Sequence, residues 1–301
     1  MKCLITGISG FLAAYISQKF SDHNFKIIGI HHSLVKPQNR AERCYRIHLP
    51  HKDIYKVIEM EKPDVVVHAA GTASVPFSME HPYTDFSVSV PATAILLDAL
   101  RRHAPTADFF FLSSAAVYGN PQKLPVTEEA TTAPISPYGY HKLMGEELCR
   151  EYRKIYGLNT IVLRIFSAYG PGLHKQVIYD TVKKFMQQKE VHLYGTGRES
   201  RDFIHGQDVA NAIYSLSQQS EAELIYNLAS GREVTIKELA ETVKELMNSD
   251  KKITFSGEHE PGKPNNWAAD ISRIKQAGFS PSISLENGID SLIQSVQGNS
   301  N

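Results

Sequence analysis

The sequence has little cysteine and no long apolar run. Its three cysteines, Cys3, Cys44 and Cys149, are far apart and show no C-x-x-C spacing, which excludes a disulfide framework and gives no sign of a zinc site. The apolar pair Leu4–Ile5 is followed at once by Thr6–Gly7, so it is too short for the core of a signal peptide. No stretch of about 20 apolar residues occurs. We therefore expect a protein with reduced thiols that resides in the cytosol and does not span a membrane.

Charge of one sign is also missing. The 32 basic residues balance the 32 acidic residues and form no basic block, so neither a nucleic acid nor an anionic membrane is expected as a partner. Five of the 13 histidines fall between His23 and His51, but no cysteine or carboxylate accompanies them at ligand spacing. No metal site is predicted.

Short apolar runs alternate with helical patterns along the first part of the chain. This alternation is typical of an α/β fold with a doubly wound parallel sheet, the Rossmann arrangement. After about Pro171 the pattern is less regular, which indicates a smaller C-terminal α/β region at 171–301. The expected strands are Cys3 to Thr6, Lys26 to Ile30, Val65 to Ala69, Phe109 to Ser113 and Ile161 to Ile165, and the expected helices are Pro82 to Arg102, Pro137 to Tyr156 and Asp208 to Ser217.

A glycine-rich turn follows the first expected strand. It has the form G-x-x-G-x-x-A, from Gly7 through Gly10 to Ala13. Glycines at these positions allow a tight turn and a close approach of the backbone to a pyrophosphate, and the helix that follows offers free N–H groups. The turn therefore predicts a dinucleotide site that includes Gly7, Gly10, Phe11 and Leu12.

The end of the second expected strand lacks the acidic residue that holds the ribose hydroxyls of NAD in many enzymes. His31 stands near that position, and Lys36 and Arg40 follow it. His31 is predicted to lie at the cofactor. The basic residues leave NADP open as an alternative to NAD, unless the histidines here are only solvated loop residues.

Tyr138 and Lys142 lie four residues apart near the start of an expected helix and thus share one face. A nearby ammonium, together with the positive charge of an oxidised nicotinamide, stabilises phenolate, so tyrosine can exchange a proton with a hydroxyl group. The spacing alone has little weight, because it recurs in Tyr15 with Lys19 and in Tyr179 with Lys183.

The position of Ser114 distinguishes Tyr138 and Lys142 from the other two pairs. This serine lies 24 residues before Tyr138, in Leu112-Ser113-Ser114-Ala115-Ala116-Val117-Tyr118-Gly119. The expected place is just past the carboxyl end of a strand, where ligands bind in open α/β sheets. Ser114 is predicted either to hydrogen-bond the reacting oxygen or only to cap a turn.

Together these segments resemble the extended short-chain dehydrogenases/reductases, in particular the nucleotide-sugar epimerase/dehydratase group. The resemblance covers nearly the whole chain and implies an NAD-dependent enzyme that acts on a nucleotide-diphosphate sugar. The segments that carry it are Gly7 to Ala13, His68-Ala69-Ala70-Gly71, Ser113 to Gly119, Ser136 to Lys142, Leu163 to Pro171 and Arg201-Asp202-Phe203-Ile204-His205.

The resemblance also implies roles for single residues. Ser114, Tyr138 and Lys142 would be the catalytic set. Further cofactor contacts would come from Ala69, Ala70, Gly71, Ser89 and Phe166, beside Tyr138 and Lys142. The sugar nucleotide would be held by Thr72, Ser114, Ser167, Gln176, Tyr194, Arg201 and Asp270. Arg201 suits a phosphate because its guanidinium forms paired charge-assisted hydrogen bonds; otherwise it would form a surface ion pair with Asp202.

The same resemblance divides the chain and implies an assembly. Residues 1–170, with contributions from about 200–230, would bind the dinucleotide, and 171–301 would mainly bind the nucleotide sugar. The two long helices expected at Pro82 to Arg102 and Pro137 to Tyr156 would pair with those of a second copy in a homodimer.

Ala115 and Ala116 narrow the expected reaction. Dehydratases of this group carry an acid after the serine, because removal of water needs an additional acid and base, and alanine cannot supply either. The sequence thus favours a 4-epimerase that works through a 4-keto sugar over a 4-keto-sugar reductase, with a 4,6-dehydratase or a non-catalytic dinucleotide-binding protein less favoured.

Some positions depart from the group. Ser89 and Ser167 stand where relatives tend to have asparagine, and Glu260 stands where many carry an arginine for the diphosphate. Either Lys263 takes over that contact or the nucleotide is held differently.

Overall fold

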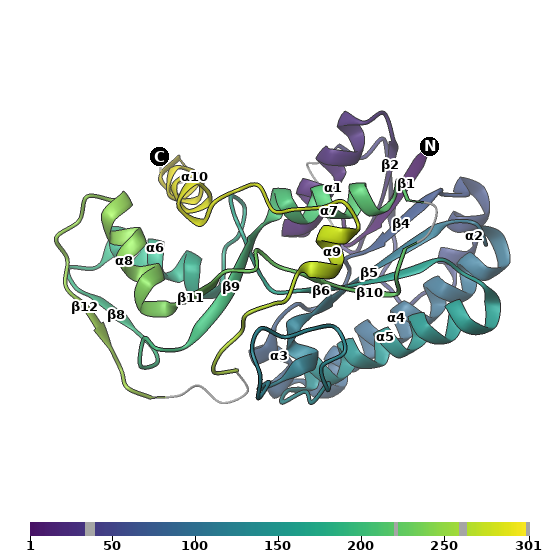
Figure 1. The fold of residues 1–301 in the computed structure, drawn as a ribbon. Helices are drawn as coiled ribbons and strands as arrows, with labels where there is room; N and C mark the ends of the chain where they lie inside the picture. Colours follow the sequence, from purple (N-terminus) through teal and green to yellow (C-terminus); the bar gives the residue numbers. More distant parts are fainter. Residues whose placement is uncertain (34–39, 220–221, 259–263, 299–301) are drawn as a thin grey trace.

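The larger part of the protein is built around a seven-stranded parallel sheet (Figure 1). The computed structural model describes residues 1–33, 40–219, 222–258 and 264–298. The strand order is β10-β6-β5-β4-β1-β2-β3, and every neighbouring pair is parallel. The expected doubly wound α/β fold is confirmed. The strands are β1 (Lys2–Thr6), β2 (Lys26–His31), β3 (Arg43–Arg46), β4 (Val65–His68), β5 (Asp108–Ser114), β6 (Thr160–Ile165) and β10 (Ile225–Leu228).

Helices cover both faces of this sheet. On one face α1 packs against α7, and on the other α4 packs between α2 and α5. Their bounds are α1 (Phe11–Asp22), α2 (Asp53–Glu61), α3 (Val75–Glu80), α4 (Pro82–His103), α5 (Pro137–Tyr156) and α7 (Gly206–Leu216), with a 3₁₀ turn η1 (Ala115–Tyr118) after β5 and a short α9 (Ser272–Gln276) that contacts β10.

The central strands are apolar on both sides because both sides are covered. In β1 the side chains of Cys3 and Ile5 join the core beneath α1 and α7. Leu4, which points the other way, joins the core beneath α2, α4 and α5. This two-sided burial explains why the strands read as continuous apolar runs in the sequence.

The sequence-based boundaries agree closely with the structure, and α5 has the predicted bounds. Strand β3 was not expected, because its sequence RCYR is only half-buried and lacks an apolar run. The expectation that Asp208 begins a helix is wrong: α7 begins at Gly206, with His205 as its N-cap. Asp208 is buried and accepts hydrogen bonds from Ser282 instead.

The C-terminal part forms a second, smaller lobe with its own apolar core (Figure 1). Its sheets have the orders β11-β9-β7 and β12-β8. The elements are β7 (Ser167–Tyr169), α6 (Gln176–Gln187), β8 (Val191–Leu193), β9 (Ser200–His205), β11 (Glu233–Thr235), α8 (Ile236–Leu246), β12 (Ile253–Phe255) and α10 (Leu285–Gly298). Within the ranges that the structure describes, no helix has the length and apolar character needed to cross a membrane.

A buried ion pair joins α5 to β6. Arg164 Nη2 lies 2.7 Å from Glu146 Oε2, and both side chains are almost fully buried. Arg164 also donates to the Tyr118 hydroxyl at 2.9 Å, while Glu146 accepts from the Ser113 hydroxyl at 2.5 Å. Hydrogen bonds from several sides satisfy both charges, which is the condition for a buried pair to be tolerated.

We expect Arg164→Met to lower the free energy of unfolding by about 3–5 kcal/mol, because Glu146 is then left buried without its cation. The control is Arg232→Met, which removes an exposed ion pair with Glu238 and should cost about 0–1 kcal/mol. Urea unfolding followed by circular dichroism measures both. Equal, small losses would contradict the structural role given to the buried pair.

Candidate active site

The glycine turn lies against the loop that follows β4. Gly7 has φ +67°, and a Cβ placed on it would be 2.9 Å from the backbone of Ala70. Gly10 donates to the Gly7 carbonyl at 2.8 Å and is the N-cap of α1, where no side chain caps the helix. The first N–H groups of α1, which include those of Phe11 and Leu12, therefore face an anion site without a side-chain competitor. This cradle fits a dinucleotide pyrophosphate.

A buried histidine orders the same loop. The Ala70 N–H donates to Thr6 Oγ1 at 3.2 Å, and Thr6 Oγ1 lies 2.7 Å from His68 Nδ1. On its other side, His68 Nε2 lies 3.2 Å from Thr93 Oγ1, which donates to the carbonyl of Ser89. Burial lowers the pKa of His68 to about 3, so its ring is neutral, and the network assigns the hydrogen to Nε2. The chain of bonds fixes two segments predicted to contact the cofactor.

His31, at the end of β2, is largely buried and its Nδ1 lies 3.2 Å from the Ser33 hydroxyl. Arg40 donates to Gln18 Oε1 at 2.8 Å, so α1 holds its side chain. Lys36 lies outside the described residues. The position after β2 thus carries a histidine and no carboxylate.

The three predicted catalytic residues meet at the carboxyl end of β5. Ser114 is the last residue of β5 rather than just beyond it, and its side chain lies beside Tyr138, whose pKa it lowers. It also accepts from the Ala116 N–H at 3.2 Å. Ser114 therefore caps the turn, and its contact with the reacting oxygen stays a prediction.

Lys142 lies one helical turn after Tyr138. Its Nζ is 5.7 Å from the centre of the Tyr138 ring and donates to the carbonyl of Leu112 at 2.8 Å. Burial lowers the pKa of Lys142 to about 8, against the opposing charges of Asp85 and Glu146. Burial also raises the pKa of Tyr138 to about 12, although the bond with Ser114 lowers it in part. In the protein alone, burial therefore favours the neutral form of Tyr138.

The local sequence explains where Tyr138 sits. Ser136 caps α5 and accepts from the Gly139 N–H, and Pro137 opens the helix, both common at helix starts. The Tyr138 N–H donates to Ser78 Oγ at 3.1 Å. Ser78 belongs to α3 and was not predicted, because a contact across 60 residues leaves no local signal in the sequence.

The two other Tyr–Lys pairs lie elsewhere. The Tyr15 hydroxyl donates to the carbonyl of Pro171, and Lys19 lies over the ring of Tyr214. Tyr179 and Lys183 line a different pocket, beside α10.

Two of the predicted substrate residues, Tyr194 and Arg201, line one pocket of about 140 Å³ in the smaller lobe. Asn265 lies there too, and Arg201 donates to its carbonyl at 3.1 Å. The guanidinium of Arg201 is 5.5 Å from the centre of the Trp267 ring. The carboxylate of Asp202 points elsewhere: it is fully buried and accepts from backbone N–H groups at 230, 231 and 269.

The other predicted contacts are more scattered. Phe166 is buried, with its ring centre 6.0 Å from that of Trp267, and Ser167 begins β7 directly after it. Gln176 is exposed and begins α6 with φ +74°. The Asp270 side chain accepts a hydrogen bond from the Ser272 N–H at 2.8 Å and so stabilises a turn.

Glu260 and Lys263 both lie outside the described residues. The idea that Lys263 takes over the missing diphosphate contact therefore stays a prediction. Of the residues that can be placed, no three His, Cys, Asp or Glu side chains gather as they would around a metal ion.

The chain is similar to known proteins in sequence and in fold. The model of the NAD dependent epimerase/dehydratase family matches residues 3–229. A putative UDP-glucose 4-epimerase of Methanocaldococcus jannaschii is 29% identical and 98% of each chain is covered. A dTDP-glucose 4,6-dehydratase of Escherichia coli is 26% identical over 98% of this chain and 92% of the relative. The crystal structure of a UDP-glucose 4-epimerase with UDP-glucose, from Thermotoga maritima, superposes with a TM-score of 0.92 at 25% identity over the whole of both chains.

We expect Arg201→Met to weaken the binding of UDP by about 10- to 100-fold, because a charge-assisted hydrogen bond to a phosphate is worth roughly 1.5–3 kcal/mol. Isothermal titration calorimetry measures the affinity. Arg201→Lys keeps the charge and should lose less. As a control, Arg232→Met removes an exposed arginine bound to Glu238 and Glu286. If both methionine variants bind UDP as the unmodified protein does, Arg201 is not a phosphate ligand.

Proposed function

The chain belongs to the NAD dependent epimerase/dehydratase family, and we propose that within this family it is a nucleotide-sugar 4-epimerase. The observation that carries the proposal is the catalytic set itself. Ser114 lies beside Tyr138, Lys142 lies one turn behind, and buried alanines at 115 and 116 stand where an additional acid would be needed for dehydration.

The proposed chemistry uses these side chains at one carbon of the sugar. Bound NAD supplies the site that accepts a hydride and returns it. Tyr138 removes the proton of the 4-hydroxyl and later gives it back, while Ser114 hydrogen-bonds the same oxygen and Lys142 holds positive charge beside the phenolate. Between removal and return of the proton the 4-keto sugar would turn over in the site, which would expose its other face for reduction. No net oxidation results.

We assign the ligands to the two lobes in the same proposal. The seven-stranded sheet, with the glycine turn, would hold NAD, and β10 and α7 extend this part beyond residue 200. The pocket with Tyr194 and Arg201 would hold the nucleotide diphosphate. A uridine nucleotide is the first candidate, because the Methanocaldococcus relative is named for UDP-glucose and the Thermotoga structure contains it.

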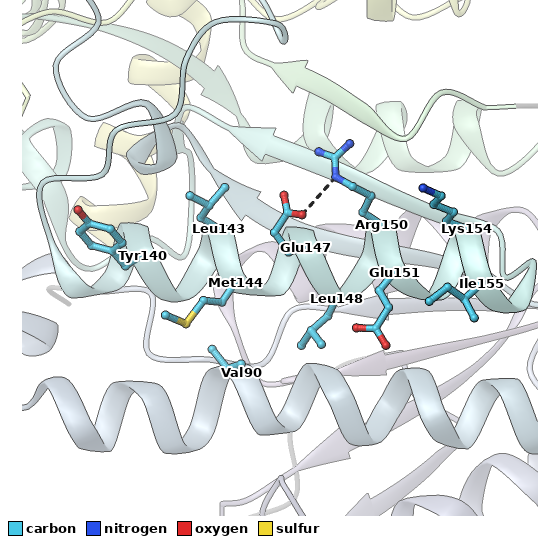
Figure 2. Close-up of a pocket in the computed structure, with 10 residues that line it drawn as sticks. All are labelled: Val90, Tyr140, Leu143, Met144, Glu147, Leu148, Arg150, Glu151, Lys154 and Ile155. Atoms are coloured by element: carbon cyan, nitrogen blue, oxygen red, sulfur yellow. Dashed lines mark ion pairs between the residues drawn. The ribbon is translucent and has the colours of Figure 1, made fainter.

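We further propose a homodimer formed through α4 and α5. Their outer face has a groove of about 670 Å³ whose lining Figure 2 shows, with Met144 and Leu148 turned toward Val90. Tyr140 is 51% and Met144 44% exposed, which is high for such large apolar side chains. The groove also carries acidic residues at 147 and 151 and basic residues at 150 and 154. A second copy related by a twofold axis can pair each charge with its opposite.

The cysteines support a cytosolic location. Cys3 and Cys149 are buried, Cys44 is half-buried, and none of the three takes part in a disulfide. Free thiols suit a reducing compartment.

An epimerase should need no added cofactor. We expect the purified protein to release NAD on denaturation and to convert UDP-glucose, or another sugar of a UDP, dTDP, GDP and CDP panel, with no matching change in absorbance at 340 nm. Tyr138→Phe should lower the rate by at least about 100-fold, whereas Tyr179→Phe, with a lysine at the same spacing, should not. Turnover that consumes NADH or NADPH mole for mole would instead establish a keto-sugar reductase.

The dimer has a separate test. We expect Met144→Glu to produce monomers in sedimentation velocity, because it places a carboxylate in the apolar part of the interface. The control is Met60→Glu on α2, at a methionine that is also exposed but does not line the groove. Dimers that persist in the Met144 variant would exclude this face as the interface.

A further inference from the structure

A fully buried carboxylate lies beneath the proposed sugar site. Asp85, in α4, has no exposed surface. One of its oxygens accepts the hydroxyl hydrogen of Thr72, from the loop after β4. The other contacts Nδ1 of His141, in α5, between Tyr138 and Lys142. Three segments that are distant in sequence thus meet at one charged group, and the catalytic chemistry described above does not use it.

The network determines which atoms carry hydrogen. An ionised carboxylate can only accept, so both of its neighbours must donate. The hydrogen on His141 is therefore assigned to Nδ1. Thr72 has a single hydroxyl hydrogen, which it donates to Asp85. Thr72 is partly exposed. On its exposed side, its hydroxyl oxygen therefore has only lone pairs left and can act only as a hydrogen-bond acceptor.

A hydroxyl oxygen held in this way selects its ligand. It accepts a hydrogen bond from a sugar hydroxyl, but it repels a carbonyl or carboxylate oxygen, which brings a second acceptor. Sites built to bond a hydroxyl discriminate strongly against analogues that lack it, because the partner is left unpaired. We propose that Asp85 and His141 are positioning residues that hold Thr72 as a hydrogen-bond acceptor for one ring hydroxyl of the sugar. This inference rests on the proposed function in that it takes the ligand to be a sugar nucleotide.

The same carboxylate acts on the catalytic pair through its charge. Burial raises the pKa of Tyr138, and the charge of Asp85 raises it further. Burial lowers the pKa of Lys142, and Asp85 opposes that change. Loss of the Asp85 charge should therefore lower both pKa values. The other titratable groups that act in this region are His68 of β4 and Glu146 and Cys149 of α5.

The test measures binding first. UDP-glucose and its 2-, 3-, 4- and 6-deoxy forms are titrated by calorimetry into the protein and into Thr72→Val. We expect one deoxy form to bind the unmodified protein about 10-fold more weakly than UDP-glucose, and that penalty to vanish in Thr72→Val. Thr72→Ser keeps the hydroxyl and should restore the penalty.

The positioning role has its own matched variants. His141→Asn keeps an N–H donor toward Asp85, whereas His141→Leu removes it. We expect the deoxy penalty to survive in the asparagine variant and to fall in the leucine variant. Asp85→Asn removes the charge while retaining an acceptor for Thr72, so both limbs of the pH profile of kcat/KM should move to lower pH, which a merely structural residue would not cause.

The outcomes separate the two proposals. Equal deoxy penalties in the unmodified protein and in Thr72→Val, or loss of the penalty in His141→Asn as complete as in His141→Leu, would overturn the positioning role while the 4-epimerase assignment stood. The binding experiment gives the same information whether the protein is an epimerase or a reductase. If epimerisation is not observed but the deoxy penalties follow the expected pattern, the inference about Thr72 is still supported. If no sugar nucleotide binds, the proposed function and this inference fail together.

Discussion

The packing of α5 on β5 and β6 is the contact on which the site depends. Gly145 lets the helix lie so close to the sheet that a Cβ there would overlap the ring of Phe111. One residue later, Glu146 binds Arg164 of β6. One turn earlier, Lys142 donates to the backbone of β5. These anchors occupy the helix face that carries Tyr138, so the position of the tyrosine over Ser114 follows from the way the helix is attached.

Much of this arrangement could be read from local sequence. A central strand such as β4 is apolar apart from its last residue, and α5 has proline at its start and glycine after its end, so their limits were predicted closely. Ser114, Tyr138 and Lys142 could be found because each follows a recognisable strand or helix start. The sequence did not reveal Ser78, His68 or Asp85, whose roles arise from contacts between distant segments. Asp208 shows the converse: its residue type suggested a helix cap, but burial made it a partner for residues 282 and 283.

Burial has opposite effects on the two members of the catalytic pair. It disfavours the charged form of each, so it raises the pKa of the tyrosine and lowers that of the lysine. The sequence-based argument took the ammonium together with the charge of an oxidised nicotinamide to lower the pKa of Tyr138, whereas in the protein alone burial raises that pKa. In the protein without a ligand, burial thus favours the neutral form of Tyr138.

The path of the chain between the two lobes bears on how the protein is made. The chain leaves the large sheet after β6, builds β7 to β9 in the smaller lobe, and only then returns to add β10 beside β6. It then crosses again to β11 and comes back for α9, which contacts β10. A nascent chain that emerges from its amino end therefore cannot complete the large sheet until residue 228 has left the ribosome. The smaller lobe cannot be completed until α10 has also been synthesised. Neither lobe can therefore be synthesised and folded before synthesis of the other has begun.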